Sequence, residues 1–450
     1  MPLLKTFAAV AIATFVGHSL AVPVVPHPSV ANDLVLTPEN TLSETNPYRN
    51  GPHRNGHKIP ASSNSAEELS VSVYNNLQSD SMNAYVTGLD PNGILVCLTP
   101  GGSWFAPKAN GSISGIIPQI ITEDIAIPMG DYGTNTSFTI PSYVQSARIW
   151  FADGHLKFYT GLNATGYLTL VEPSPSNQHD PSANVNWGFV ELTTNSDGLT
   201  VNLSYVDFVG LPLGIKVQGS NGTQTALGVP ADAVSSICSA LSAQASSDGQ
   251  PWDKLCISDS SGNALRVIAP YDYIQQNPGA FASYWTRYIS QVWAKYSTTP
   301  LTIDTQAAAG LVNCTTLGNS TLTCDGDNRP YERPSAGDIF GCNTGPFAIE
   351  ETDNDVHRAV VPRLCAAFDR STFLLRGGNV QPSLDSSHYY TTSPTDYYSK
   401  IVHEQEVDGR GYAFAYDDVN PPDDDGSNAS GLLNDPDPSL LSITIGGPTS

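Results

Sequence analysis

The stretch 184–211 constrains the fold most, because it reads as two long β-strands joined by a tight turn. Both halves are rich in aromatic and β-branched residues, which favour strands. Between them, Asn-Ser-Asp-Gly at 195–198 is a strong turn sequence whose Gly198 can adopt a positive φ. Each strand carries one acidic residue, Glu191 or Asp207. A carboxylate in a half-buried strand is unfavourable unless it has a partner or a function, so the hairpin indicates a polar site.

The length of the turn decides whether these two carboxylates can act together. A two-residue Asp-Gly loop would place Glu191 and Asp207 on opposite faces of the sheet, because side chains alternate along a strand. A three-residue loop at 196–198 would place both on the same face, with Asp207 opposite Trp187. The sequence therefore predicts either this odd-length loop or a bulge that breaks the alternation.

The same-face arrangement would also gather aromatic side chains around the acids. The residues on that face would be Trp187, Phe189, Glu191, Thr193, Tyr205 and Asp207. Aromatic rings offer flat apolar surfaces for sugar rings, and two carboxyl groups can cleave a glycosidic bond. The acids would lie roughly 13 Å apart along the backbone. Inward-leaning side chains could reduce that gap to the about 6.5–9.5 Å of inverting glycosidases, but hardly to the about 5–5.5 Å of retaining ones. The alternative is an ordinary hairpin whose acids face solvent.

The hairpin resembles glycoside hydrolase family 64, the β-1,3-glucanases related to thaumatin-like proteins. The resemblance lies in ELTTN, which begins at Glu191, followed by VNLSYVDFVGLPL, which begins at Val201. In that family an acid pair sixteen residues apart serves as general acid and general base, and Glu191 and Asp207 have this separation. The resemblance therefore implies an endo-β-1,3-glucanase that works with inversion, with Glu191 as general acid and Asp207 as general base.

The likeness extends over most of the chain from about 67 to 447. NAYVTGLDPNG from Asn83 and GGSWFAP from Gly101 resemble the family's first strands. HEQEVDGRGYAFAYDDV from His403 resembles its closing segment, in which YAFAYDDV is similar to the C-terminal strand of thaumatin-like proteins. We expect Asp417 in this segment either to line the floor of the cleft or to cap a turn. The residues expected to bind substrate are Trp187, Thr193, Thr194, Asn195, Tyr205 and Asp417.

The charge and the motifs of the chain limit the kinds of ligand and partner that it can bind. The chain has 43 acidic and 20 basic residues and a net charge of −23, so it offers no basic patch for nucleic acid or an anionic membrane. A neutral polysaccharide, β-1,3-glucan, suits this surface. No C-x-x-C or H-E-x-x-H spacing occurs, and we expect neither a metal nor another cofactor. We expect a monomer.

The N-terminus reads as a signal peptide over residues 1–21, with Lys5 before a short apolar core and cleavage after Ala21. The protein is expected to be secreted. Residues 22–65 are rich in Pro, Asn, Ser and His and read as a disordered pro-segment or linker. Eight N-glycosylation sequons fit the same compartment: Asn110, Asn135, Asn163, Asn202, Asn221, Asn313, Asn319 and Asn428. Alternation along the strand points Asn202 away from the face of Asp207.

Seven cysteines in a secreted chain indicate disulfides with one thiol left over. Local spacing favours Cys238–Cys256, Cys314–Cys324 and Cys342–Cys365, although six cysteines allow 15 pairings. Cys97 lies in an apolar strand, and we expect it to be the free thiol.

The order of elements predicts a β-rich α+β fold. Short strands separated by Gly/Pro turns over 66–220 favour an antiparallel β-barrel or sandwich. The resemblance implies that this domain is thaumatin-like. Residues 221–395 read as an inserted mixed α/β lobe, with helices at 230–245, in 271–296 and at 354–370. In the last helix Asn354 is the N-cap, Pro362 a kink or boundary, and His357 and Arg358 surface residues. Residues 396–450 return to the β domain through a last strand at 440–445, and a wide groove between the two parts is the expected ligand site.

Two other functions compete with the glucanase. A non-catalytic, thaumatin-like glucan-binding or antifungal protein would have the same fold and aromatic residues, but it would not require both acids at this spacing. A secreted protease or esterase has less support, because the chain has no G-x-S-x-G elbow and no zinc signature.

Overall fold

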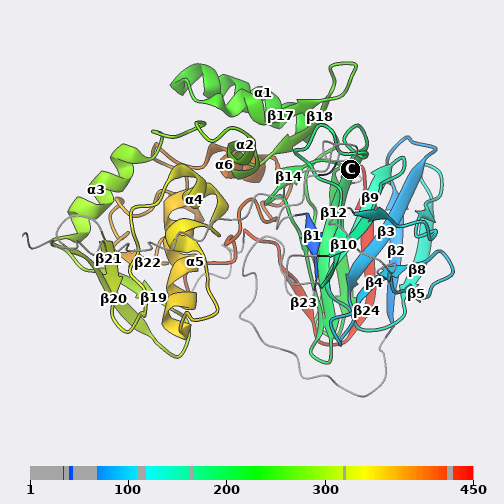
Figure 1. The fold of residues 1–450 in the computed structure, drawn as a ribbon, viewed down its shortest axis with the longest axis horizontal. Coiled ribbons are helices and arrows are strands. Elements are labelled where there is room, and N and C mark those ends of the chain that lie inside the picture. The colour runs from blue at the N-terminus through cyan, green and yellow to red at the C-terminus, as the bar shows by residue number, and fades with distance from the viewer. Residues whose placement is uncertain are drawn as a thin grey trace, which may run out of the picture.

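The computed structural model is β-rich, with six α-helices among the residues it describes. The described residues are 34, 40–43, 68–108, 118–162, 167–317, 321–422 and 429–448. A β region built from long sheets lies on the right of Figure 1, and a mixed α/β region lies on the left. The predicted signal peptide, most of the segment 22–65 and the sequons at Asn110, Asn163, Asn319 and Asn428 lie outside the described residues.

Two sheets dominate the β region, and the described strands do not close into a barrel. The larger sheet has the order β23 (Leu433–Asp435), β13 (Gly198–Leu203), β12 (Asn186–Asn195), β9 (Gln145–Asp153), β3 (Met82–Leu89), β4 (Leu95–Leu98) and β5 (Trp104–Phe105), with β7 (Ile127–Pro128) beside β3. The five-stranded sheet has the order β16 (Gly222–Ala226), β15 (Leu213–Gly219), β24 (Pro438–Ile445), β2 (Leu69–Asn75) and β8 (Asn135–Ile140). The predicted last strand is thus confirmed as β24, which pairs in parallel with β2.

The central strands of the larger sheet are covered on both faces. Every residue of β3 is buried, as are Ala147 to Ala152 of β9. One face packs toward β15, since a Cβ added to Gly188 of β12 would lie 2.7 Å from the Leu211 carbonyl oxygen. The other face carries Trp150 and Phe189, whose rings lie 5.1 Å apart. Burial on both faces explains why apolar residues occur on both faces of these strands instead of alternating with polar ones.

Two smaller sheets flank this second face. One has the order β1 (Thr41–Leu42), β11 (Leu168–Val171), β10 (Tyr159–Leu162) and β6 (Gln119–Ile120). The other has the order β14 (Phe208–Val209), β18 (Ala264–Ile268) and β17 (Cys256–Ser258). The presence of β1 differs from the disorder expected for 22–65, because Leu42 is fully buried and pairs with Leu170.

The mixed region and its borders contain the helices. These are α1 (Ala233–Asp248), α2 (Pro270–Gln276), α3 (Thr286–Tyr296), α4 (Ala336–Gly341), α5 (Asp355–Asp369) and α6 (Tyr397–Gln405). A small sheet has the order β21 (Thr321–Cys324), β20 (Leu311–Leu317), β19 (Leu301–Asp304) and β22 (Val380–Gln381). The predicted cap is confirmed, since the Asn354 side chain accepts a hydrogen bond from the His357 backbone N–H. Pro362 does not end α5, which continues to Asp369.

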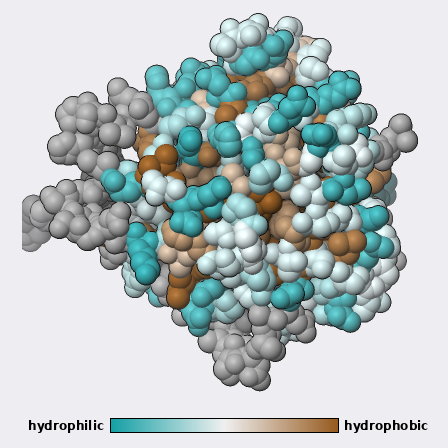
Figure 2. Space-filling view, turned by 90° about the vertical axis from the view of Figure 1, so that its right-hand side faces the viewer, coloured by the Kyte–Doolittle hydropathy of each residue, from teal (hydrophilic) through white to brown (hydrophobic). Residues whose placement is uncertain are grey.

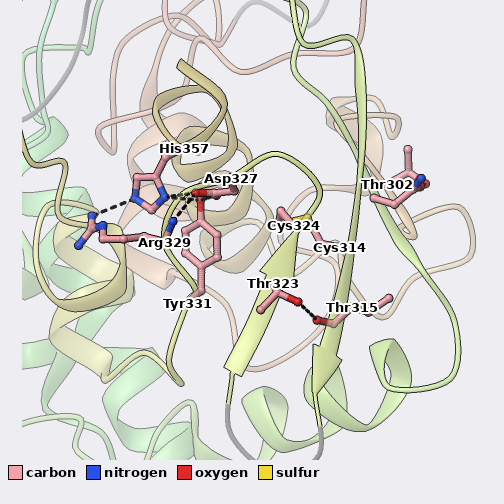
Figure 3. Close-up of a disulfide and its surroundings, with 10 residues drawn as sticks. Thr302, Cys314, Thr315, Thr323, Cys324, Asp327, Arg329, Tyr331 and His357 are labelled. Atoms are coloured by element: carbon pink, nitrogen blue, oxygen red, sulfur yellow. Dashed lines mark hydrogen bonds and ion pairs between the residues drawn. A yellow bond between two sulfur atoms is a disulfide. The ribbon is translucent and has the colours of Figure 1, made fainter. Parts of the chain in front are cut away.

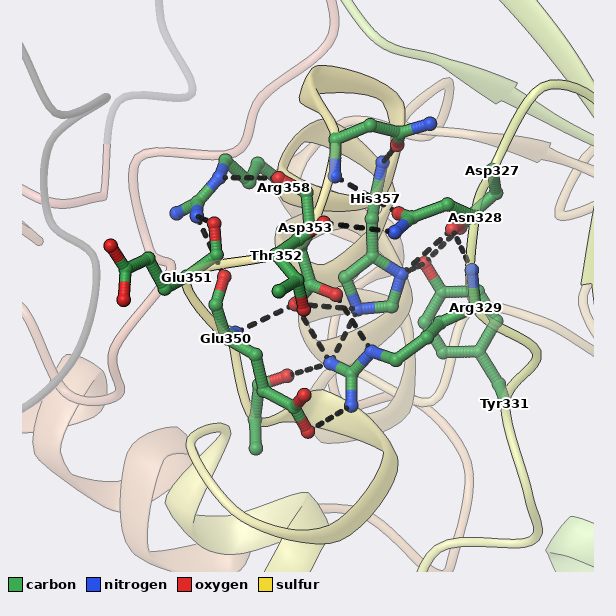
Figure 4. A network of polar contacts seen from close by, with 12 residues as sticks. Asp327, Asn328, Arg329, Tyr331, Glu350, Glu351, Thr352, Asp353, His357 and Arg358 are labelled. Carbon is green, nitrogen blue, oxygen red and sulfur yellow. Dashed lines mark hydrogen bonds and ion pairs between the residues drawn. The ribbon is translucent and has the colours of Figure 1, made fainter.

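His357 is fully buried, so its prediction as a surface residue is wrong. Its Nδ1 lies 2.9 Å from Asp327 Oδ1, and its Nε2 lies 2.9 Å from Arg329 Nη2 (Figure 4). Tyr331 stacks on the imidazole at 5.0 Å. This network joins the start of α5 to the loop after β21.

The cysteine prediction is confirmed. The three disulfides are Cys238–Cys256, Cys314–Cys324 and Cys342–Cys365. The second joins β20 to β21 beside the His357 network (Figure 3). Cys97 is free and buried, and burial raises its pKa to about 12, so it is a neutral, unreactive thiol at ordinary pH.

The surface of the β region is mostly hydrophilic. On the face shown in Figure 2, apolar residues form scattered patches instead of one continuous area. Across the described ranges, no helix is both long and apolar enough to cross a membrane.

Candidate active site

A polar row crosses four strands of the larger sheet on its second face. Thr87 of β3 pairs with Arg148 of β9, Arg148 pairs with Glu191 of β12, and Glu191 pairs with Asn202 of β13. The next row along the strands is aromatic, with Tyr85 opposite Trp150. Since cross-strand neighbours on one face lie within about 5.5 Å, this register alone brings the four polar side chains together.

Arg148 is the centre of the site. Its guanidinium is 3% exposed and contacts three carboxylates. Nη1 lies 3.0 Å from Glu172 Oε2, and Nη2 lies 3.1 Å from Glu191 Oε1 and 3.7 Å from Asp207 Oδ2. Nε also donates to Glu191 Oε1, at 3.2 Å. Burial alone would lower the pKa of Arg148, but the three carboxylates outweigh burial and raise it, so the cation is permanent.

Asp207 reaches Arg148 because the second arm of the hairpin does not continue as one strand. β13 ends at Leu203, and the chain then leaves the sheet, so that Phe208 of β14 pairs with Ile268 of β18. The backbone carbonyl of Asp207 accepts a hydrogen bond from the Ala269 N–H at 2.7 Å, which fixes the backbone just before β14.

The predicted three-residue turn is wrong. Asn195 pairs directly with Gly198, which leaves the two-residue loop 196–197, and Gly198 has a φ of 108°. If β13 ran on in this register, Asp207 would fall on the opposite face from Glu191. Neither the odd-length loop nor a bulge occurs; instead β13 ends at Leu203 and the chain leaves the sheet, which removes that conflict.

The two acids lie much closer than the backbone spacing suggested. Both contact the same nitrogen, Arg148 Nη2, so Glu191 Oε1 and Asp207 Oδ2 lie at most 6.8 Å apart, the sum of the two contact distances. The earlier separation of roughly 13 Å assumed a continuous strand. Glu191 is 25% exposed and Asp207 9%, so solvent or a ligand can reach both.

A pocket opens beside Asp207. Its lining is Asn40, Arg148, Pro173, Ser174, Pro175, Ser176, Trp187, Phe189, Asp207, Phe208 and Asp272. The aromatic part of this wall is packed, since the rings of Trp187 and Phe208 lie 4.4 Å apart and Arg148 stands 4.0 Å over the Phe189 ring. Trp187 is only 1% exposed, so it presents an edge to the pocket while most of the ring belongs to the core.

Three of the other predicted substrate-binding residues help to shape the hairpin. Thr193 Oγ1 accepts from the Ser146 N–H at 3.3 Å, and Thr194 Oγ1 accepts from the Val144 N–H at 3.0 Å. Asn195 Oδ1 accepts from the N–H of Asp197 at 2.7 Å and so closes the turn. Alternation along β12 places Thr193 and Asn195 on the face of Glu191 and Thr194 on the opposite face.

Tyr205 and Asp417 lie in a different buried cluster. Asp417 is fully buried, and its Oδ2 accepts from the backbone N–H groups of Ala413 and Phe414. It therefore caps a turn, which was the second of its two expected roles. YAFAYDDV forms turns instead of the expected strand, apart from a bridge between Tyr412 and Ser204. Tyr205 is 6% exposed, beside the same segment.

Asn202 faces the site, contrary to expectation. Its Nδ2 donates to Glu191 Oε2 at 3.3 Å, and the residue is only 7% exposed. The expectation failed because it placed Asn202 relative to Asp207 on one continuous strand. A glycan at this sequon would have to displace the contact with Glu191.

Three site residues were not predicted: Arg148, Glu172 and Asn40. A signal existed for Arg148, because a cation within the apolar strand 147–151 needs a partner just as Glu191 does. Glu172 and Asn40 reach the site through pairing between distant segments, which no local pattern reveals. Among the described residues, one cluster has metal-ligand types, Cys342, Cys365 and Asp369, but both cysteines are in a disulfide.

Known proteins are similar to this chain over almost all of the described residues. The family model described as beta-1,3-glucanase, glycoside hydrolase family 64, matches residues 67–445. The glucan endo-1,3-beta-glucosidase of Cellulosimicrobium cellulans is 26% identical over 290 residues, and that of Arthrobacter sp. (strain YCWD3) is 27% identical over 294 residues. Each match covers 63% of this chain, and the chain spans about half the length (50%) of these curated relatives.

Solved structures give the same fold. A laminaripentaose-producing beta-1,3-glucanase, crystallised with laminaritetraose, is similar with a TM-score of 0.71 and 26% identity, over 84% of this chain and 98% of that chain. A beta-1,3-glucanase domain from Clostridium beijerinckii has a TM-score of 0.65 and 22% identity, over 85% of this chain and 100% of that chain. The second likeness concerns the fold alone.

Proposed function

Because this chain belongs to glycoside hydrolase family 64, the beta-1,3-glucanases, we propose that it is a glycoside hydrolase that cleaves internal bonds of β-1,3-glucan. The observation that carries the proposal is the contact of both Glu191 and Asp207 with Arg148 Nη2, which places them within 6.8 Å of each other. Asp207 lines the pocket and Glu191 is partly exposed to solvent, and two such neighbouring carboxyl groups are what hydrolysis of a glycosidic bond requires.

In the proposed reaction Glu191 is the general acid and Asp207 the general base. Glu191 donates a proton to the oxygen of the leaving sugar, while Asp207 removes a proton from the water that attacks the anomeric carbon. Attack from the opposite face gives inversion. The limit of 6.8 Å includes the lower end of the inverting range, which begins at about 6.5 Å, and also the retaining range, so inversion rests on the family resemblance.

Arg148 supports this pair in two ways. It fixes both carboxyl groups from one side, so they keep their relative orientation when substrate enters. It also stabilises the carboxylate forms, including that of Glu191 after the acid has given up its proton. Asn202 holds the other oxygen of Glu191 and restricts rotation of its carboxyl group.

Purified protein should release oligosaccharides from laminarin, and the variants Glu191→Gln and Asp207→Asn should each lose activity while folding normally. A dinitrophenyl β-laminaribioside distinguishes the general acid from the general base, because its dinitrophenolate leaving group needs no proton. Glu191→Gln should retain much of its rate on this substrate, whereas Asp207→Asn should not. Wild-type turnover of laminarin by both variants would refute the acid pair. A β-anomer as the first product in proton NMR would refute inversion.

We also propose that the protein is secreted and glycosylated. The signal peptide, the sequons and the three disulfides support a secreted glycoprotein, and the resemblance supports a relation to thaumatin-like proteins. A non-catalytic glucan-binding protein is the competing function. Binding to insoluble β-1,3-glucan without release of reducing sugar would favour it.

A further inference from the structure

A short N-terminal arm, Asn40–Ser43, lies outside the residues 67–445 that match the family, yet it is built into the β region. Leu42 is fully buried in the hydrophobic core, and Asn40 and Ser43 are 3% and 1% exposed. The arm forms the edge strand β1, which pairs with β11. Such burial means that the arm is a fixed part of the fold and not a chance contact.

A continuous series of contacts leads from the arm to the proposed acids. The Asn40 carbonyl accepts a hydrogen bond from the Glu172 N–H at 2.8 Å. The Glu172 carboxylate lies 3.0 Å from Arg148 Nη1, and the other end of that guanidinium lies 3.1 Å from Glu191. Asn40 also lines the pocket together with Asp207.

We propose that the arm is a positioning element of the active site, one that this chain adds to the family domain. The inference rests on the proposed function. The arm pairs with β11 and accepts a hydrogen bond from the N–H of Glu172, the residue that follows β11. These contacts fix the backbone of Glu172. Glu172 in turn holds Arg148, and Arg148 holds Glu191 and Asp207. Without the arm, β11 becomes an edge and Glu172 loses its acceptor, so the acids lose their fixed spacing. A misplacement of about 1 Å in an active site can lower the rate about 100-fold.

The test uses Leu42→Ala and Leu42→Asp in the full chain, because Leu42 anchors the arm without touching the acids. Turnover of laminarin should fall at least about tenfold in Leu42→Asp and less in Leu42→Ala, mainly in kcat. The control is Ile443→Ala in β24, which is equally buried but lies in the other sheet. It should lower the melting temperature and leave kcat unchanged. If Leu42→Asp fails to fold, the comparison of kcat between Leu42→Ala and Ile443→Ala tests the proposal.

A double-mutant cycle separates positioning from general loss of stability. If the arm acts through Glu172, then adding Leu42→Ala to Glu172→Gln should lower kcat less than twofold beyond Glu172→Gln alone, since residues in one network are not additive. Multiplicative effects, or a wild-type kcat in Leu42→Ala and Leu42→Asp, would overturn the proposal. The proposed function fails separately, through wild-type turnover in Glu191→Gln.

Discussion

Arg148→Met removes a buried cation from between three carboxylates, and the structure sets the size of the effect. The Glu172 side chain is fully buried, so its carboxylate would lose the guanidinium that balances its charge. Removing one partner of a buried ion pair costs about 3–5 kcal/mol. Glu191 is 25% exposed and can turn toward water, so its lost contact adds no more than about 1 kcal/mol. We therefore expect Arg148→Met to lower the free energy of unfolding by about 3–6 kcal/mol.

Urea unfolding followed by circular dichroism measures this loss as a lower transition midpoint at an unchanged m-value. Adding Glu172→Gln to Arg148→Met removes the unpaired charge, so the double variant should be more stable than Arg148→Met alone. The matched control is Arg266→Met. Arg266 is equally buried, but its Nη2 donates to the carbonyls of Ala183 and Val185.

The control variant removes hydrogen bonds to neutral carbonyls, which costs about 1–3 kcal/mol, and only the longer-range attraction between Arg266 and Asp180. If Arg148→Met were no more destabilising than Arg266→Met, or if Glu172→Gln brought no recovery, then the charge on Arg148 would not balance Glu172. The explanation of the site as one electrostatic unit would then be wrong.

Three further predictions concern the rest of the molecule. Burial lowers the pKa of His403, but Glu406 and Asp417 outweigh burial and raise it to about 10. Because this pKa lies above that of the unfolded chain, the protonated His403 stabilises the fold below about pH 6.5, and this stabilisation is lost toward pH 10. Melting temperatures should fall over that interval, and His403→Gln should flatten the curve; a parallel curve would contradict this. Asn202→Asp places a second carboxylate beside Glu191 Oε2 and should lower laminarin turnover at least about tenfold, or ~1.4 kcal/mol, more than Asn202→Ala does; equal rates would count against that contact. Replacing Cys314 and Cys324 by Ser should lower the free energy of unfolding by about 2–4 kcal/mol with kcat unchanged, because the hairpin lies in the mixed region; a matching loss of kcat would refute this.

Local chemistry made much of the fold predictable. Strands such as β3 follow from apolar runs bounded by Pro/Gly turns, and the start of α5 follows from its Asn354 cap. The three disulfides were predictable because each joins cysteines that are near in sequence. His357 was misplaced because its partners, Asp327 and Arg329, come from another segment.

The acids were predictable but their geometry was not. Glu191 and Asp207 stand out as charges in strand-like sequence, and their family resemblance assigns them roles. Their meeting depends on the chain leaving the larger sheet after Leu203 to pair with β18, and that pairing is non-local. Alternation along a strand is a reliable rule only while the strand lasts.

The parallel pairing of β2 with β24 has a consequence for synthesis of the protein. Val71 pairs with Leu441, so the ribosome makes β2 about 370 residues before the strand that pairs with it. Until then β2 and β15 each lack the neighbour between them, and unpaired strand edges invite association with other chains. The five-stranded sheet is thus completed only after translation of almost all of residues 67–445, the part that matches the family. A ribosome that stops before residue 438 releases a chain whose β2 and β15 edges are unpaired.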